Sequence, residues 1–178
     1  MANFAHIIPF LRRAEGGYVN NTNDEGGETM DGVTWATWQS VFGNTHDRFL
    51  AMSNEDWGMI FKKNYWDQML GDQINSQRIS DAVVDWVYNS GKHYPEADVQ
   101  DILIHSFGQH IGEDGDFGPK TKLAVRENIT DNKAFALDYL QARRNFYTSL
   151  ADAKPKFKQF LKGWLNRCSD LQEFVESA

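Results

Sequence analysis

Apolar side chains recur every three or four residues along most of this chain, and this period is the strongest constraint on its fold. Each stretch with that spacing predicts an amphipathic helix with one buried face. With 178 residues, 13% of them aromatic, the chain is long enough to bury a substantial core. We therefore predict a mainly α, folded protein. The clearest helical stretches are 35–42, 57–65, 77–89, 95–107 and 135–147.

Short polar residues mark where several of these helices begin. Thr34 can cap the helix that follows it, and Ser53 with Asp56 has the spacing of a capping box. Asn3 can cap the first helix. Pro9 lies inside that apolar run, so it requires either a kink or a helix that begins at the proline itself.

The segment 18–34 is the one good strand region in the sequence. Its glycine, asparagine and acidic residues predict loops around a short hairpin, and Asp31 with Gly32 is a possible tight turn. Just before it, the first helix is expected to stop at Gly16-Gly17, because glycines permit positive φ.

Glu15 stands directly before those two glycines, at the predicted end of the first helix. The negative end of a helix dipole disfavours a charged carboxylate, so Glu15 would favour its protonated form. A protonated carboxylic acid at a pocket edge is the group that glycosidic bond cleavage requires. Asp24 follows a polar turn and could return to the same cleft as a second carboxylate. On spacing alone, a solvated surface glutamate after a helix is the favoured explanation of Glu15.

Several short motifs follow one another along the chain, at residues 15–20, 24–29, 32–34, 65–67, 85–91, 114–121 and 163–167. In this order they resemble glycoside hydrolase family 108, a family of lysozyme-like N-acetylmuramidases that includes phage and prophage endolysins and proteins labelled secretion activators. The resemblance implies a mainly α, lysozyme-like helical fold with a small β-hairpin near the N-terminal catalytic helix. It also implies bacteriolytic cleavage of cell-wall peptidoglycan.

The family's catalytic acid is the glutamate of its Glu-Gly-Gly-Tyr motif, which the resemblance places at Glu15. We expect Asp24 to position water or to support the developing cation. Asp85 and Asn89 are one turn apart on a predicted helix and either line the cleft or are a solvated residue and a helix stop. The expected substrate-binding residues are Tyr18, Asn20, Thr29, Tyr65, Asp85 and Asn89.

Two regions are expected without a flexible linker between them. Residues 1–92 form the lysozyme-like catalytic region, and residues 93–178 form a helical, peptidoglycan-binding-like region packed with it as one unit. The segment 114–121 resembles a turn of peptidoglycan-binding modules; it is either a structural turn or a contact with glycan or stem peptide. As a structural turn, it is expected to anchor Phe117 in the core and to open a new helix at Gly118-Pro119. Its acidic residues lack the ligand spacing of an EF-hand, so we expect no metal.

Composition excludes several other classes of protein. The net charge of -7 argues against nucleic acid as a partner. Basic residues do gather at Arg143-Arg144 and along 154–162, where a solvated face is favoured over a site for a polyanionic glycan. The histidines lack zinc-ligand spacing, and there is no nucleotide or phosphate-binding motif, so no cofactor is expected. Cys168, the single cysteine, is expected to be a buried structural thiol.

Bacterial peptidoglycan is therefore the expected partner, with no membrane insertion. The N-terminal sequence lacks the pattern of a secretory signal, which predicts synthesis in the bacterial or phage-infected cytoplasm and release by a holin or an exporter. Two other functions stay open. One is a noncatalytic peptidoglycan-binding or regulatory protein, and the other is a lytic transglycosylase, which forms a 1,6-anhydro sugar instead of adding water.

Overall fold

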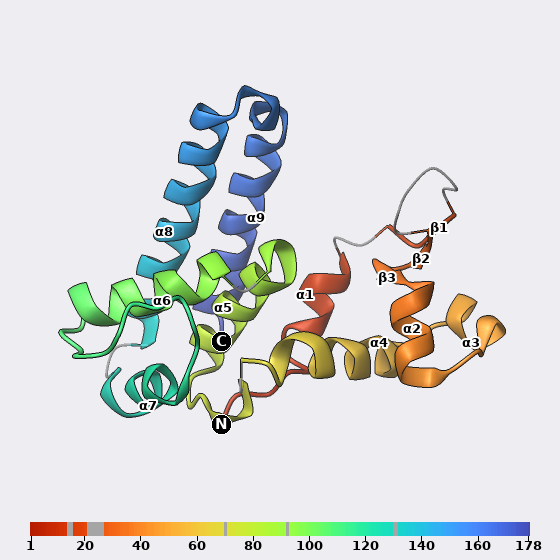
Figure 1. Ribbon diagram of the computed structural model, residues 1–178, viewed down its shortest axis with the longest axis horizontal. Helices are drawn as coiled ribbons and strands as arrows, with labels where there is room; N and C mark the ends of the chain where they lie inside the picture. The colour runs from red at the N-terminus through yellow and green to blue at the C-terminus, as the bar shows by residue number, and fades with distance from the viewer. Residues whose placement is uncertain (14–15, 21–26, 70, 92, 130–131) are drawn as a thin grey trace. The chain divides into compact units, whose positions relative to one another are not determined.

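The computed structural model describes residues 1–13, 16–20, 27–69, 71–91, 93–129 and 132–178. The chain divides into two compact units (Figure 1). The N-terminal unit comprises Phe4–Gln68, and the C-terminal unit comprises Met69–Ala178 together with Met1–Asn3. Both units are built mainly of helices, which confirms the mainly α prediction.

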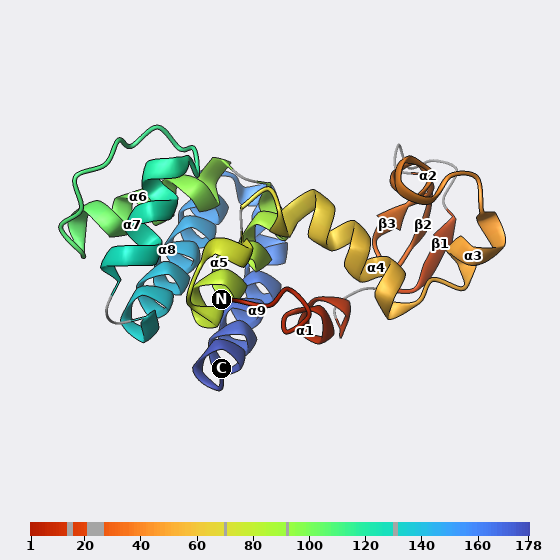
Figure 2. The ribbon, with the colours of Figure 1, turned by 90° about the horizontal axis from the view of Figure 1, so that it is seen from below.

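The N-terminal unit contains an antiparallel sheet with the strand order β1-β2-β3, followed by helices (Figure 2). The predicted hairpin at Asp31-Gly32 is confirmed, and β1 adds a third strand to it. Asp31 has φ 45° and Gly32 has φ 76°, as a tight two-residue hairpin turn requires. The elements are α1 (Ile8–Arg13), β1 (Tyr18–Asn20), β2 (Glu28–Met30), β3 (Val33–Thr34), α2 (Trp35–Phe42), α3 (His46–Leu50), α4 (Asn54–Phe61) and the π-helical η1 (Lys62–Trp66).

Two of the three predicted caps are confirmed. The Thr34 side chain accepts a backbone N–H from the first turn of α2, and Ser53 forms a complete capping box with Asp56 at the start of α4. The Asn3 cap is wrong, because α1 begins at Ile8, whereas the alternative of a helix that begins at the proline is supported, since Ile8 directly precedes Pro9. Proline fits the first turn of a helix, where its missing N–H is not needed.

Aromatic rings form much of the core of the N-terminal unit. Trp57 and Phe61 on α4 are stacked, with ring centroids 5.3 Å apart. Trp38 on α2 meets Phe49 on α3 edge-on at 5.6 Å. All four are buried, which confirms that the helical spacing of these aromatics reflects core packing.

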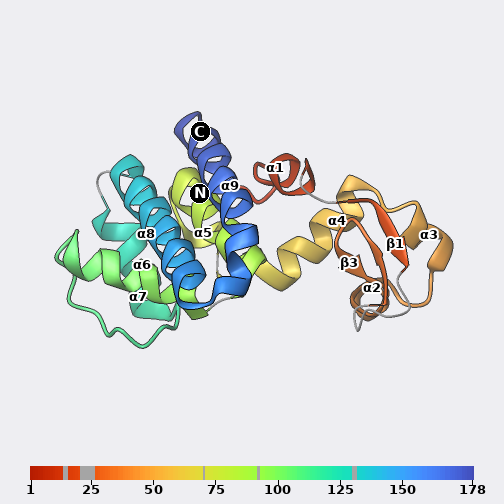
Figure 3. The same ribbon diagram turned by 90° about the horizontal axis from the view of Figure 1, so that it is seen from above.

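The C-terminal unit is a helical assembly in which α8 and α9 lie side by side and α5 packs against both (Figure 3). Its elements are the 3-10 turn η2 (Gly71–Gln73), α5 (Gln77–Ser90), α6 (His93–His105), α7 (Pro119–Asn128), α8 (Asn132–Ala153), the 3-10 turn η3 (Pro155–Phe157) and α9 (Lys158–Glu176). Throughout the described part of the chain, the helices are too short or too polar to span a bilayer.

A single carboxylate joins these three helices. Asp85 on α5 accepts hydrogen bonds from Arg143 on α8, at 2.6 Å, and from Arg167 on α9, at 2.7 Å. The side chains of Asp85 and Arg143 are 0% exposed, and that of Arg167 is 18% exposed. Asp85 is thus neither solvated nor available to line a cleft, and Arg143 does not belong to a solvated basic face. Those expectations were wrong because sequence spacing does not show which helix covers a polar position.

The buried charges change the acid–base properties of their surroundings. Burial opposes the charge of Arg143, but the neighbouring carboxylate of Asp85 favours that charge, and the pKa of the guanidinium is raised. Cys168 is fully buried, as expected, and burial raises the pKa of its thiol. A thiol that resists ionisation is a poor nucleophile, so the structural interpretation of Cys168 is supported.

Removing the carboxylate should strongly destabilise the C-terminal unit. Asp85→Ala leaves two cations without their shared counter-ion, one of them fully buried, which should lower the free energy of unfolding by about 3–5 kcal/mol. Asp101→Ala is the control, because that side chain is 53% exposed and should cost less than about 1 kcal/mol. Urea unfolding measures both values. Equal stability of the two variants would show that the buried cluster contributes nothing.

Asp98 on α6 should make stability depend on pH. Burial, and then repulsion from Asp101, raise the pKa of Asp98 from 3.8 to about 6. A raised pKa means that the folded state favours the protonated acid. The stabilisation of the folded state by this group is therefore complete below pH 3.8 and is lost as the pH rises through about 6. Asp98→Asn should remove this loss. Urea unfolding of both proteins across that range tests it, and parallel pH profiles would contradict it.

Candidate functional site

Four polar side chains meet on and beside the sheet of the N-terminal unit, and we call them the sheet cluster: Tyr18, Asn20, Glu28 and His46. The hydroxyl of Tyr18 donates to Glu28 Oε1 at 2.9 Å, and Asn20 Nδ2 donates to the Tyr18 oxygen at 3.3 Å. His46 Nε2 lies 2.7 Å from the same Glu28 oxygen. The strand register explains this arrangement, because Asn20 pairs with Glu28 and alternate residues share a face.

The histidine of the sheet cluster is held by aromatic neighbours. The ring of Trp35 contacts His46 edge-on at 5.0 Å, and the ring of Phe49 lies 6.0 Å away. The Glu28 side chain is 17% exposed, whereas that of His46 is 46% exposed. The cluster therefore has a carboxylate at its inner end and reaches solvent through the imidazole, with Tyr18 and Asn20 exposed beside it.

Asp31, in the turn between β2 and β3, ties the surrounding segments together. Its backbone N–H donates to the oxygen of Gly17 at 3.0 Å, and its backbone oxygen accepts from the indole of Trp57 at 3.1 Å. Its carboxylate forms an ion pair with Arg12 on α1. Arg12 also donates to Asn54 at the start of α4. One residue thus connects α1, the start of β1 and α4.

The two predicted catalytic residues, Glu15 and Asp24, lie outside the described residues. Two described residues close to Glu15 in the sequence bond to Asp31: Arg12 through its side chain and Gly17 through its backbone oxygen. The chain therefore enters and leaves the Glu-Gly-Gly motif at points held by the same turn.

The six predicted substrate-binding residues are divided between the two units, four in the N-terminal unit and two in the C-terminal unit. Tyr18 and Asn20 lie together in the sheet cluster. Thr29 alternates with Glu28 along β2 and so faces the other side of the sheet, where its hydroxyl is 3.5 Å from the Val19 oxygen. The half-buried ring of Tyr65, on η1, stacks on Phe61 at 5.8 Å.

Asp85 and Asn89 belong to the C-terminal unit. Because Asp85 is buried and both of its carboxylate oxygens bind arginine, its expected contact with substrate is replaced by a structural role. Asn89 is exposed near the end of α5, where its amide donates to the Asp85 backbone oxygen at 2.6 Å. Asn89 therefore stays a proposed substrate contact.

A largely apolar groove of about 570 Å³ lies between α1 and α4. Gly58 makes the close approach of these helices possible, since a Cβ there would come within 3.0 Å of Ile8 Cδ1. Arg12, which holds Asp31, also lines the groove. The sheet cluster does not contribute to its lining.

The conspicuous segment 114–121 is organised by one buried amide. Gln100 on α6 is 1% exposed, and its Nε2 donates to Asp114 Oδ1 at 2.7 Å and to Thr121 Oγ1 at 3.1 Å. Its Oε1 accepts the backbone N–H of Gly115 at 2.8 Å. The hydrogen bond from Gln100 holds the pKa of Asp114 below its usual value. These polar groups are used within the protein, which favours a structural turn.

The same turn sets the start of α7. Phe117 is 2% exposed, and its backbone N–H donates to Glu96 Oε2 at 3.3 Å. Gly118 then takes an extended conformation as the N-cap, and Pro119 opens the helix. The predicted anchoring by Phe117 and helix start at Pro119 are confirmed.

No group of three or more His, Cys, Asp or Glu side chains within the described ranges is arranged to hold a metal ion.

Sequence reasoning missed two members of the sheet cluster. Glu28 belongs to the motif at residues 24–29, and its strand position puts it on the same face of the sheet as Tyr18 and Asn20. Strand periodicity could therefore have indicated it. His46 had no signal, because its approach to Glu28 depends on how α3 packs.

Two family descriptions match successive parts of the chain. Residues 8–91 match the family described as Glycosyl hydrolase 108, and residues 94–169 match the family described as Predicted Peptidoglycan domain. The junction of the two matches falls between α5 and α6, whereas the compact units divide between residues 68 and 69. The helix α5 thus lies within the match to the hydrolase family, yet it packs with α8 and α9 in the C-terminal unit.

A solved structure titled "Structure of Brucella abortus SagA" is similar over nearly the whole chain. The two are 27% identical, with a TM-score of 0.71, and the similarity covers 98% of this chain and 94% of the other. No curated protein matches this sequence.

Replacing Asp31 should loosen the framework of the sheet. Asp31→Ala removes the partner of Arg12 and places an unsuitable residue at positive φ, so the free energy of unfolding should fall by about 2–4 kcal/mol. Asparagine adopts positive φ more readily than alanine, so Asp31→Asn should lower the free energy of unfolding by less than Asp31→Ala does. Hydrogen exchange should quicken at residues 16–20 and 28–34 in Asp31→Ala.

The control is Asp47→Ala, an exposed acidic residue in the first turn of α3, which should cost less than about 1 kcal/mol. Unchanged exchange in the sheet of Asp31→Ala would show that the turn does not hold these segments.

Proposed function

Because the chain belongs to glycosyl hydrolase family 108 and carries a peptidoglycan domain after that region, we propose that it is an N-acetylmuramidase, a lysozyme-type enzyme. It hydrolyses the β-1,4 bond between N-acetylmuramic acid and N-acetylglucosamine in cell-wall peptidoglycan. The observation that carries this proposal is the order of the two matches along one chain. A glycosyl hydrolase region followed by a peptidoglycan domain on the same chain favours peptidoglycan as the substrate.

Glu15 acts as the general acid in this proposal. It follows α1, whose carboxyl end disfavours an additional negative charge. Arg12, in the last turn of α1, forms an ion pair with Asp31. This pairing reduces the electrostatic stabilisation that Arg12 would give to a charged form of Glu15. A carboxylic acid that stays protonated can donate to the leaving glycosidic oxygen as the sugar ring gains positive charge.

Asp24, with Thr29 close in sequence, positions the attacking water or supports the developing cation. The exposed members of the sheet cluster support a sugar-binding role nearby, because Tyr18 offers an aromatic ring and Asn20 an amide. Tyr65 is proposed to stack on a sugar ring, since Phe61 supports one face of it. Glu28 orients Tyr18 through their hydrogen bond and so acts as a positioning residue.

The proposal is tested with purified peptidoglycan, the wild-type protein and Glu15→Gln. The wild type should release fragments that end in reducing N-acetylmuramic acid, identified by mass spectrometry. Glu15→Gln should be slower by about 100- to 10,000-fold, because glutamine cannot donate the proton. Glu113→Gln is the matched control, because Glu113 is an exposed glutamate in the loop before α7 and lines neither pocket, and it should retain full activity.

Each other result has a definite meaning. Full activity in Glu15→Gln would remove Glu15 from the chemistry. Products lighter by one water, with a 1,6-anhydro end, would identify a lytic transglycosylase. Binding of peptidoglycan without any cleavage by the wild type would identify a noncatalytic binding protein.

A further inference from the structure

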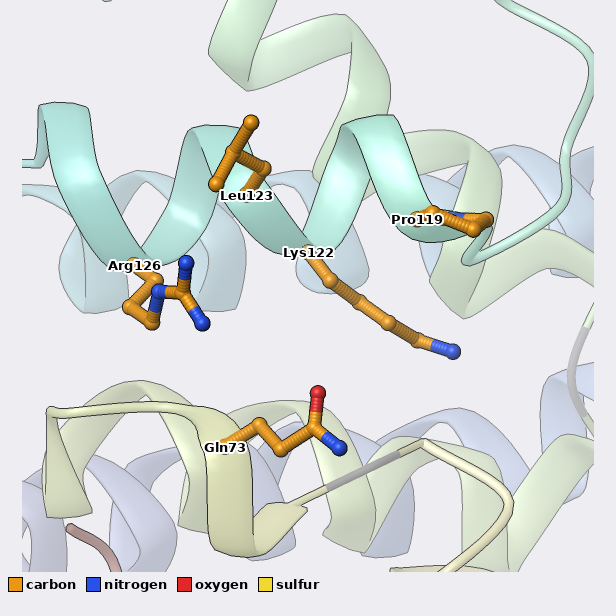
Figure 4. A pocket seen from close by; sticks show the side chains of 5 residues that line it. All are labelled: Gln73, Pro119, Lys122, Leu123 and Arg126. Carbon is orange, nitrogen blue, oxygen red and sulfur yellow. The ribbon is translucent and has the colours of Figure 1, made fainter.

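A second pocket lies entirely within the C-terminal unit. It has a volume of about 300 Å³ and opens between η2 and α7. Figure 4 shows Lys122 and Arg126 extending from one side toward the space in front of Gln73, which comes from the other side. Its lining residues are Gln73, Pro119, Lys122, Leu123 and Arg126.

The position of this pocket follows from the turn held by Gln100. That turn buries Phe117 and starts α7 at Pro119, so it sets where the first turns of the helix lie. The ammonium group of Lys122 lies over the ring of Phe117, 5.7 Å from its centroid. Lys122 and Arg126 are four residues apart and therefore share a face of α7.

The pocket presents cations on a chain whose overall charge is negative. The net charge is -7, yet the two ionised groups that line the pocket are a lysine and an arginine. Arg126 is 2.9 Å from Glu127, but these side chains are 42% and 52% exposed, so the pair is weak and can be exchanged for a ligand. A guanidinium beside an ammonium suits a carboxylate, which the arginine can bind with two hydrogen bonds.

The rest of the lining suits a short peptide. Gln73 offers an amide that can donate to, or accept from, a peptide group. Leu123 is 45% exposed and, with Pro119, supplies an apolar wall that fits a methyl side chain. The volume is at the lower end of small-molecule sites, so it accommodates part of a peptide but not a glycan strand.

We infer that this pocket binds the carboxylate-bearing stem peptide of peptidoglycan, with Arg126 and Lys122 holding a carboxylate and Gln73 holding the adjacent peptide group. All of α7 lies within the match to the peptidoglycan domain. The inference rests on the proposed function only in taking peptidoglycan as the partner. Its chemistry is independent of glycosidic cleavage.

The test uses the full chain, labelled with ¹⁵N, and the probe N-acetyl-alanyl-γ-glutamyl-lysine, a piece of stem peptide without sugar. Titration should shift the backbone amide signals of residues 120–126 and the side-chain amide signal of Gln73. The affinity should fall about tenfold or more in Lys122→Ala/Arg126→Ala, because both charged donors are lost. It should also fall when both carboxylates of the probe are amidated, and as salt is raised.

Lys120→Ala is the matched control, since Lys120 lies on the same helix, is exposed and does not line the pocket. It should bind the probe as the wild type does. Wild-type affinity in the double variant, shifts confined to other elements, or no binding at about millimolar probe would each overturn the inference. Because the probe has no glycosidic bond, a failure of the proposed muramidase activity would leave this result unaffected.

Discussion

The C-terminal unit depends on the carboxylate of Asp85, which lies where α5, α8 and α9 meet. Burying a carboxylate with two arginines costs desolvation energy, and that cost is offset only if each partner is well placed. Arg143 and Arg167 meet this condition through short hydrogen bonds to opposite oxygens. Because α5 lies at the end of the hydrolase match while α8 belongs to the peptidoglycan match, this cluster joins the last part of the first match to the second match in one compact unit. The boundary between families is therefore not the boundary between structural units.

The turn 114–121 shows how a conspicuous motif can serve function indirectly. Its acidic and glycine residues draw attention in the sequence, yet its polar groups are satisfied by Gln100 and Glu96. What the turn achieves is the placement of α7. The less conspicuous side chains of Lys122 and Arg126 then line a pocket whose charge is opposite to that of the whole protein. Charge summed over the chain therefore gave little information about the charge at this surface.

The candidate site could be predicted only in part. The motif after α1 indicated Tyr18 and Asn20, and the structure brings these two together. It adds Glu28 and His46, which are separated along the chain and meet because α3 packs beside the sheet. Asp31 also had a predicted role as a turn residue, and its turn geometry is confirmed. Its bonds to α1, β1 and α4 could not be predicted, because each partner comes from another element.

The sequence by itself determined the elements whose causes are local. The cap at Thr34, the capping box at Ser53 and the start of α7 at Pro119 each depend on residues within one turn, so short spacing suffices to predict them. The tertiary structure alone decided the environment of charged groups. Asp85 sits on a helix in a pattern that also fits a surface residue, and only the packing of α8 and α9 makes it a buried anchor. The physical reason is that capping acts over a few residues, whereas desolvation and ion pairing depend on every element that surrounds a side chain.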